Sequence, residues 1–272
     1  YQIWLRNVTE IIDRTEAYSG TAVLAVRAVA TAQLQGGLPN ITAMERGRNV
    51  RAYSNETTFV TTWTRNPAWG LLDYMTNSLY GMGPFITAND INLQSFIDFS
   101  SVCDSLVPDG AGGLEAQHYL DLVMDKKKPH WTWVNDILSL YRSAMIYSQG
   151  KFKIITDRGD LPTRQVFHSG NIVPGTLQLT IGTGDPTKPN QATVSYPNRE
   201  QDFNLDTLYV QNSASVFGAG DAIKEFDMAL IGVTRESEAV REAQWQLDRR
   251  RQVLRGYQFK TGLEALAVEP GD

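Results

Sequence analysis

Residues 66–83 read NPAWGLLDYMTNSLYGMG, and this stretch decides the helical part of the fold. Asn66 is a residue type that caps helices, and Pro67 suits the first helical position after the cap. Apolar residues then recur at helical spacing and form one face, which comprises Ala68, Leu71, Leu72, Met75 and Leu79. Gly81 and Gly83 predict the end of this helix.

The residues that follow predict a compact α/β unit. A second helix is expected at about 90–103, with an apolar stripe that ends in Cys103, and residues 119–124 (YLDLVM) predict a short strand. A third helix is expected at about 129–144, and its apolar residues at helical spacing are Trp131, Val134, Leu138, Tyr141 and Met145. Residues 145–156 (MIYSQGKFKIIT) predict a hairpin that turns at Gln149 and Gly150.

Strand signals lie on both sides of this unit. Residues 21–29 alternate, residues 36–40 predict a turn, and residues 49–63 are rich in β-branched and aromatic side chains. From residue 162 onward, Pro and Gly separate the Val/Thr/Leu runs 175–181, 191–196 and 207–210, which is typical of a barrel or sandwich. The sequence therefore predicts an α+β chain, in which residues 1–64 and 162–272 form a β-rich domain and residues 65–161 form an inserted α/β domain.

One further helix is expected within the second β-rich part, at about 235–256. It begins with Glu236 and Glu238 and ends with Arg249–Arg251, an order that suits the helix dipole, and Gly256 is placed to follow it. Residues 263–268 predict an unfinished strand before a closing Pro-Gly-Asp turn. Since the chain also starts at Tyr1 inside a β-like stretch, we expect it to be a piece of a longer polypeptide.

The composition excludes several classes of protein. The 272 residues are 42% hydrophobic and carry a net charge of −5, values that are ordinary for a globular protein and exclude a disordered one. The acidic balance argues against a chain coated in nucleic acid, because that affinity comes from Lys and Arg. The longest apolar stretch, residues 21–33, is interrupted by Arg27 and is too short to cross a bilayer.

The residues that could carry chemistry form no catalytic constellation. None of His118, His130 and His168 is paired at metal-ligand spacing, and a surface or structural role is favoured over a catalytic one for each. Cys103, the single cysteine, excludes a disulfide framework, and its place on an apolar stripe next to Asp104 favours a core residue over a nucleophile. The sequence thus predicts no catalytic, cofactor-binding or metal-binding residue.

The glycine-rich and charged segments are interpreted as turns and loops rather than as ligand-binding sites. Residues 182–188 (GTGDPTK) and 217–221 (FGAGD) lack the spacing and the following helix of a phosphate loop, so β-turns are favoured. Asp109 and the run from Asp157 to Asp160 match no calcium loop, although a carboxylate pair distant in sequence stays possible. The run Lys126–Lys128 is interpreted as a solvated loop, with a partner-facing or channel-facing patch as the alternative.

Residues 66–83 strongly resemble a segment of the phage tail tip attachment proteins, the lambda protein J family, in the order of the Asn-x-Ala-Trp, Asp-x-Met-Thr and Tyr-Gly-x-Gly elements. Residues 103–113, 144–157, 241–255 and 268–272 are also similar to that family, so the resemblance covers about residues 20–272. It implies a fold similar to phage baseplate and tail hub domains, in which β-barrels form a ring and the α/β insert decorates it.

The resemblance also implies a structural, non-enzymatic role in the virion. Such proteins form a homotrimeric hub at the distal end of the tail, contact the tail tube, tape measure and other distal tail proteins, and open for double-stranded DNA at ejection. Contact with the host envelope would belong to other regions of the full polypeptide. Two alternatives stay open from the residues alone: a tail-associated cell-wall hydrolase, and a receptor- or carbohydrate-binding module.

Overall fold

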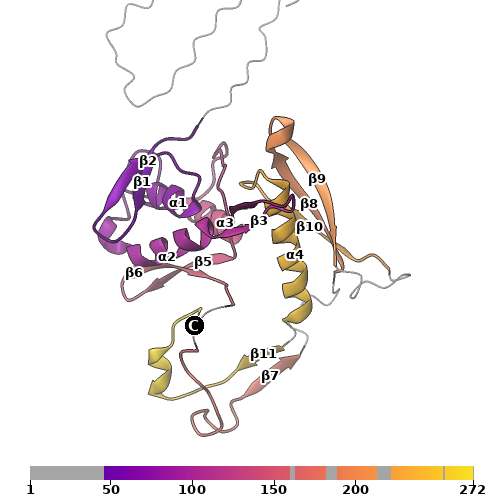
Figure 1. The fold of residues 1–272 in the computed structure, drawn as a ribbon. Coiled ribbons are helices and arrows are strands. Elements are labelled where there is room, and N and C mark those ends of the chain that lie inside the picture. Colours follow the sequence, from indigo (N-terminus) through magenta and orange to yellow (C-terminus); the bar gives the residue numbers. More distant parts are fainter. Residues whose placement is uncertain (1–45, 160–162, 182–188, 213–221, 254, 272) are drawn as a thin grey trace, which may run out of the picture. The chain divides into compact units, whose positions relative to one another are not determined.

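The structure is a computed structural model that describes residues 46–159, 163–181, 189–212, 222–253 and 255–271. The chain divides into two units, Tyr1–Gly47 and Arg48–Asp272, and every helix and strand described below lies in the second (Figure 1). The strand and turn predicted at residues 21–29 and 36–40 lie outside the described residues. The predicted division into residues 1–64 with 162–272 and an insert of 65–161 stays a prediction.

Three helices and a hairpin form the first part of the second unit. The helices are α1 (Pro67–Thr76), α2 (Leu93–Asp104) and α3 (His130–Ser139), and the hairpin joins β5 (Ser143–Ser148) to β6 (Lys151–Thr156). The smaller elements of this part are β1 (Val50–Tyr53), β2 (Phe59–Thr62), η2 (Ala88–Asp90), β3 (Leu106–Pro108) and β4 (Leu114–Ala116). Helix α2 packs on β6 and α3 packs on β5, so the hairpin is covered by helices.

Local sequence explains where these helices begin. The side chain of Asn66 accepts the N–H of Ala68 and donates to the Ser100 carbonyl at 3.0 Å, so it caps α1 and also ties it to α2. Asn92 caps α2 by accepting the N–H of Ser95. Because these side chains satisfy orphan helical donors, the predicted cap at Asn66 and Pro67 is confirmed.

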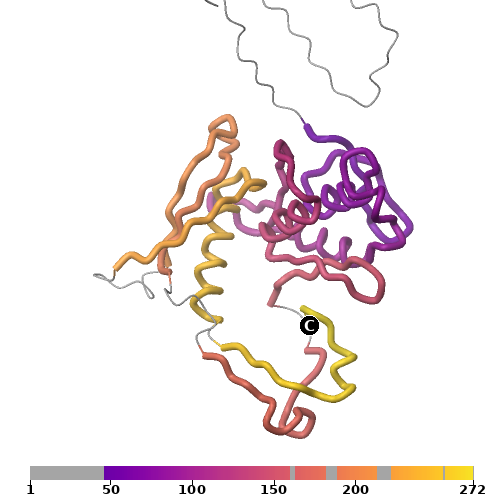
Figure 2. Tube along the Cα trace, turned by 180° about the vertical axis from the view of Figure 1, so that it is seen from behind, coloured from indigo at the N-terminus to yellow at the C-terminus, as the bar shows by residue number. Residues whose placement is uncertain are grey.

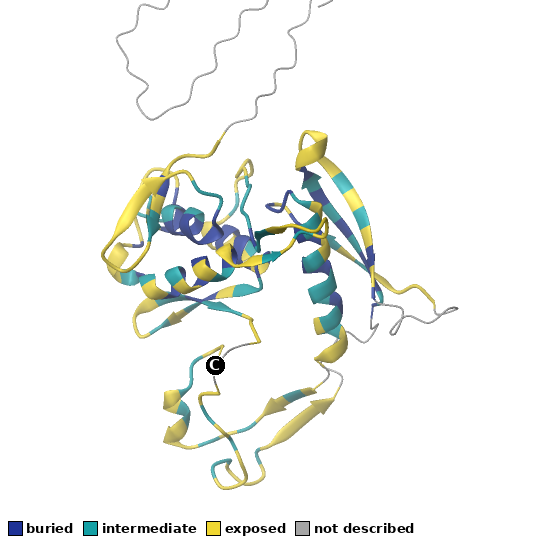
Figure 3. Ribbon diagram, in the orientation of Figure 1, coloured by how far each residue is buried: buried dark blue, intermediate teal, exposed yellow. Residues whose placement is uncertain are grey.

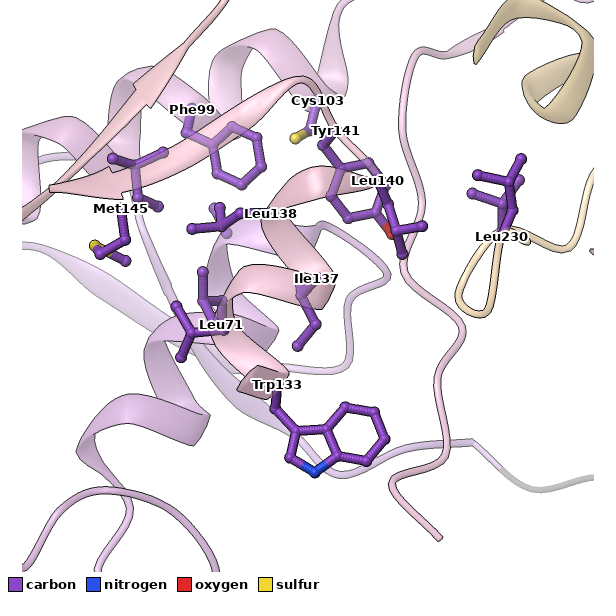
Figure 4. Packing of buried hydrophobic residues seen from close by; sticks show 14 of the residues in the cluster. Leu71, Phe99, Cys103, Trp133, Ile137, Leu138, Leu140, Tyr141, Met145 and Leu230 are labelled. Carbon is purple, nitrogen blue, oxygen red and sulfur yellow. The ribbon is translucent and has the colours of Figure 1, made fainter. Parts of the chain in front are cut away.

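A single apolar core lies between the helices and the hairpin. Figure 4 shows Leu71, Phe99, Ile137, Leu138 and Met145 directed toward one another from α1, α2, α3 and β5. Cys103 lies at its edge beside Tyr141 and is buried, which confirms its predicted place in the core. Close packing of large apolar side chains from four elements supplies the main driving force for folding here.

The hairpin turn is set by two residues. Gln149 has φ 53° and Gly150 has φ 78°, so both central positions are left-handed, as a two-residue hairpin turn requires. The register pairs Ser148 with Lys151 and Ser143 with Thr156. The hairpin predicted at residues 145–156 is therefore confirmed.

A three-stranded sheet and a long helix follow. The strands are β8 (Gln191–Asn198), β9 (Asn204–Gln211) and β10 (Glu225–Ala229), in the order β10-β8-β9, and η3 (Arg199–Gln201) lies between β8 and β9. Helix α4 (Glu236–Gln252) packs on β8 and β9 (Figures 1 and 2). Ala192, Val194 and Tyr196 of β8 are buried at every second position, which places one face of the sheet under the helix.

The last elements are β7 (Gln178–Ile181), β11 (Arg255–Gln258) and η4 (Leu263–Ala267). In the described part of the chain, β7 pairs antiparallel with β11 and with no other strand. Among the described residues, every sheet has two or three strands and none closes into a barrel. The mixed α and β class is confirmed, whereas the barrel-like ring stays a proposal that is taken up below.

Two predicted helices end earlier than expected. Helix α1 stops at Thr76 because Asn77 turns extended and its side-chain oxygen accepts the N–H of Leu79, a local bond that competes with the helix. Leu79 is consequently 88% exposed rather than part of the apolar face. Helix α3 ends at Ser139, and the left-handed Arg142 redirects the chain into β5, so Tyr141 and Met145 are buried without being helical.

Two strand predictions and one helix-cap prediction are wrong. Residues 119–124 form no strand, because the N–H groups of Leu120 and Asp121 donate to the carbonyls of Arg65 and Gly232, which belong to different segments. Residues 263–267 form the 3₁₀ helix η4 instead of a strand, since Ala265 donates to the Gly262 carbonyl three residues earlier. Gly256 belongs to β11, paired with Thr180, and does not follow α4 as a cap.

We expect Gly81→Ala to destabilise the protein. A Cβ atom there would lie 1.8 Å from the Tyr74 carbonyl oxygen, so the backbone must shift, at a cost of roughly 1–3 kcal/mol. Gly159→Ala is the matched control, because its Cβ would meet no atom within 4 Å. Chemical denaturation measures both, and equal stabilities would contradict the tight loop after α1.

Candidate functional site

A buried polar cluster centres on His118, Glu238 and Glu242. The Nδ1 atom of His118 lies 3.3 Å from Oε1 of Glu238 and 3.9 Å from Oε1 of Glu242, and all three side chains are buried. Both glutamates come from one face of α4, four residues apart, whereas His118 lies in the segment after β4. The cluster therefore joins two segments that are more than a hundred residues apart in sequence.

Each carboxylate of the cluster has several donors. Glu238 accepts the backbone N–H of Tyr119 at 3.2 Å and the guanidinium of Arg235 at 2.7 Å. The other ring nitrogen of His118 lies 3.1 Å from the amide nitrogen of Gln117. This arrangement has the Gln117 amide donate to Nε2 and the Nδ1–H of His118 donate to Glu238.

Glu242 is held by Arg142. The Nε atom of Arg142 lies 3.1 Å from both carboxylate oxygens, and its Nη2 atom lies 2.7 Å from Oε1. The same guanidinium lies 4.9 Å from the Trp245 ring centroid, one helical turn along α4. Because Arg142 leads from α3 into β5, this ion pair fixes α4 against the helical core.

Glu115 on β4 is the centre of a second group of ion pairs. It pairs with Arg235 and Arg241 and accepts a hydrogen bond from the Ser237 hydroxyl at 2.6 Å. Burial raises the pKa of the Glu115 carboxyl, but the bonds from Ser237 and Arg241 and the nearby arginine charges outweigh it and lower the pKa. Glu115 therefore stays ionised and contributes to stability at neutral pH.

Asp121 and Tyr119 complete the contact with α4. Asp121 pairs with Arg65 and accepts the Thr234 hydroxyl at 2.6 Å; burial raises the pKa of its carboxyl, and these partners lower it overall. The Tyr119 ring has the Arg65 and Arg235 guanidinium groups each 4.1 Å from its centroid. Cations over an aromatic face are attracted to it, so Tyr119 lies between two charged groups from different segments.

A hollow of about 450 Å³, with polar and apolar lining in similar amounts, opens beside this cluster. Its lining includes Ser105, His118, Arg142 and Asp157.

Burial and the charges of Asp104 and Glu238 raise the pKa of the Cys103 thiol well above its usual value, so the thiol stays protonated and is a poor nucleophile. Burial raises the pKa of the neighbouring Tyr141 in the same way. The arrangement is suited to holding segments together rather than to bond making.

The cluster does not form a metal site. Among the residues that the structure describes, no three His, Cys, Asp or Glu side chains are arranged to hold a metal ion. The carboxylates of Glu238 and Glu242 already face arginine, a competing cation.

Within the same described ranges, no helix has the length and apolar character that a bilayer crossing requires.

The other two histidines lie apart from this cluster. Nδ1 of His130, at the start of α3, lies 2.7 Å from the Tyr74 hydroxyl, which ties α3 to α1. His168 lies in a loop, where its Nδ1 accepts the Gly170 N–H at 3.0 Å and where a second hollow of about 570 Å³ opens. The structure therefore brings none of the three histidines together.

Several charged segments singled out from the sequence have local partners. Asp109 accepts the N–H groups of Ala111 and Gly113 and so shapes its own loop. Lys128 pairs with Asp136 at 2.8 Å and lies over the Trp133 ring, whereas Lys126 and Lys127 are exposed. The glycine-rich segments 182–188 and 217–221 lie outside the described residues.

Sequence reasoning missed the cluster itself. The order of charges along the helix explains Glu238 by compensation of the helix dipole, and it singles out no role for Glu242. Both lie on the buried face of α4 with Ala239, Ala243 and Leu247, so carboxylates within an apolar stripe were the available signal. No sequence pattern indicates that His118 and Arg142 are their partners.

Comparison with known proteins gives two consistent results. The sequence model of a family described as putative phage tail protein matches residues 130–272, just over half of the chain. The chain is 27% identical over 289 residues to tip attachment protein J of Escherichia phage SECphi27, which covers 100% of this chain and 23% of that protein. It is 26% identical over 281 residues to tip attachment protein J of Escherichia phage SECphi4, which covers 99% of this chain and 24% of that protein.

The chain thus spans about a quarter of the length of the curated relatives it matches. The resemblance predicted from residues 66–83 is confirmed, since both alignments extend over essentially the whole chain.

We expect Glu238→Ala to destabilise the protein by about 3–5 kcal/mol, because it leaves His118 and Arg235 without their buried partner. Glu236→Ala is the matched control, since it removes an exposed carboxylate from the same helical turn. Thermal or denaturant unfolding compares the two variants. Similar losses of stability would show that the buried cluster contributes no more than the exposed charge.

We also expect stability to fall in acid. The pKa values of Glu115 and Asp121 are lower in the folded protein than the usual 4.5 and 3.8, so the unfolded state binds these protons more tightly. Their stabilisation is present above those usual values and is lost as pH falls through the lowered ones. Denaturant titrations from pH 7 downward measure this loss, and Glu115→Gln should make it shallower. An unchanged pH profile in that variant would contradict the assignment.

Proposed function

This chain belongs to the family of putative phage tail proteins, and we propose that it forms part of the central hub at the distal end of a phage tail. The observation that carries the proposal is the similarity to two tip attachment proteins over essentially the whole chain. In this role the segment is structural: it closes the tail tube and takes part in attachment and DNA ejection through its neighbours.

The surface of the described residues supports an assembly role. Strands β2, β7 and β9 each have an outer edge without a partner in the described chain, and Figure 3 colours much of these strands as exposed. Their exposed large apolar side chains are Phe59 and Val60 of β2, Leu179 and Ile181 of β7, and Leu205 and Tyr209 of β9. Open strand edges and apolar patches favour pairing with other chains. We infer that neighbouring copies complete a barrel-like ring from residues 1–64 and 162–272, with residues 65–161 on its outside.

The hub assembles as a homotrimer around the tail axis. Its other partners are the tail tube, tape measure and distal tail proteins, and double-stranded DNA passes through it transiently. The net charge of −5 supports a passage whose walls hold phosphate weakly. Contact with the host envelope belongs to other regions of the full polypeptide.

Immunogold electron microscopy of intact virions tests the location. An antibody against residues 66–83 is expected to label the distal end of the tail, after mild disruption if the epitope is covered. Labelling along the tube or at the head would contradict the proposal. An antibody against the major tube protein serves as the positional control.

A clearing assay separates the structural role from the enzymatic alternative. We expect the purified polypeptide to leave a suspension of host peptidoglycan turbid, because the buried cluster offers no group positioned for hydrolysis. Lysozyme provides the positive control. Clearing that persists in repeated preparations of the purified polypeptide would establish a hydrolase and overturn the structural assignment.

A further inference from the structure

The paired strands β7 and β11 form a ribbon with one apolar and one polar face. The register pairs Leu179 with Tyr257 and Ile181 with Arg255, and cross-strand partners lie on the same face. The alternate pairs, Gln178 with Gln258 and Thr180 with Gly256, lie on the other face. We call Leu179, Ile181, Tyr257 and Arg255 the ribbon face.

The ribbon face is exposed although its pattern is that of a buried surface. Leu179 is 50% exposed, Ile181 76% and Tyr257 59%. Strict alternation of apolar and polar side chains is typical of a strand with one covered face. An isolated two-stranded ribbon is at best marginally stable in water, so we expect another surface to pack on this face.

A second exposed surface lies on the three-stranded sheet, on the side away from α4. Thr193 of β8 is paired with Tyr209 on one side and with Asp227 on the other, so these three residues share that face. Tyr209 is 67% exposed, and Leu205 and Glu225 lie on the same face. We call Leu205, Tyr209, Glu225 and Asp227 the sheet face.

The two faces are complementary in chemistry. Each has large apolar side chains, but the ribbon face carries the cation of Arg255 and the sheet face carries the anions of Glu225 and Asp227. Within the described residues, neither Arg255 nor Asp227 has an ion-pair partner of its own. Packing the ribbon face against an identical ribbon face would instead bring two Arg255 cations and no anion into the contact, which is less favourable.

We propose that the ribbon face of one copy of this chain packs on the sheet face of the next copy. Two different surfaces in contact make a head-to-tail interface, and such an interface closes into a ring when the rotation between copies divides a full turn. The inference rests on the proposed hub function, for which it supplies the contact between subunits. Face-to-face packing of two sheets buries the apolar side chains and leaves the charged pair at the rim.

Native mass spectrometry of the complete polypeptide that contains these residues tests the interface. Leu179→Asp puts a charge at the centre of the ribbon face and should weaken assembly at least tenfold. Gln178→Asp puts the same charge on the opposite face of the same strand and should leave assembly unchanged. Circular dichroism and thermal unfolding of the monomers show whether each variant is folded.

Charge exchange gives a second test that does not depend on the apolar contact. Arg255→Asp and Asp227→Arg should each weaken assembly, and the double variant should recover most of it, because the pair is restored with its signs reversed.

The outcomes separate this inference from the proposed function. Trimers that withstand Leu179→Asp, or single charge variants that the double variant does not rescue, overturn the interface and leave the hub intact. A large loss of monomer stability in Leu179→Asp, absent in Gln178→Asp, also overturns it, because the face is then covered within its own chain. A monomeric natural protein contradicts the trimeric hub itself.

Discussion

The contact between helix α4 and the core of three helices depends on buried opposite charges. Glu238 and Glu242 would be costly on the buried face of a helix without partners, and His118, Arg142 and Arg235 meet that need. Since α4 also packs on β8 and β9, the same charges determine where the three-stranded sheet is held. The fold therefore relies on a polar joint that is set within a hydrophobic core extending from the three helices to α4 and the sheet.

Such a joint has a different consequence from an apolar one. Two surfaces in apolar contact can shift past each other at little cost, because apolar attraction is not directional. The two carboxylate oxygens of Glu242, by contrast, accept the Arg142 guanidinium in few orientations. We infer that the cluster gives the subunit a defined geometry, which a component of a symmetric assembly requires. The proposed contact between copies through the exposed face of β9 requires that the position of this strand is fixed in this way.

Much of the helical part could be predicted from the sequence. Asn66, Pro67 and the apolar spacing identify α1, and Gln149 with Gly150 identifies the hairpin turn, because caps and tight turns are decided by neighbouring residues. The strands β8 and β9 were also expected, from β-branched runs between Pro and Gly. The errors lie where a local bond competes with a pattern, as at Asn77, or where a strand-like segment such as residues 119–124 finds its partners in several distant segments.

The sequence by itself determined the local elements, the core position of Cys103 and the family resemblance, since each depends on residues that are close together in the chain. Only the tertiary structure decided that His118 meets Glu238, that Arg142 meets Glu242, and that the apolar face of β7 and β11 is uncovered. These facts join residues as far as 120 positions apart. A charge or an apolar side chain in a sequence shows what must be satisfied, but only the folded chain shows which distant group satisfies it.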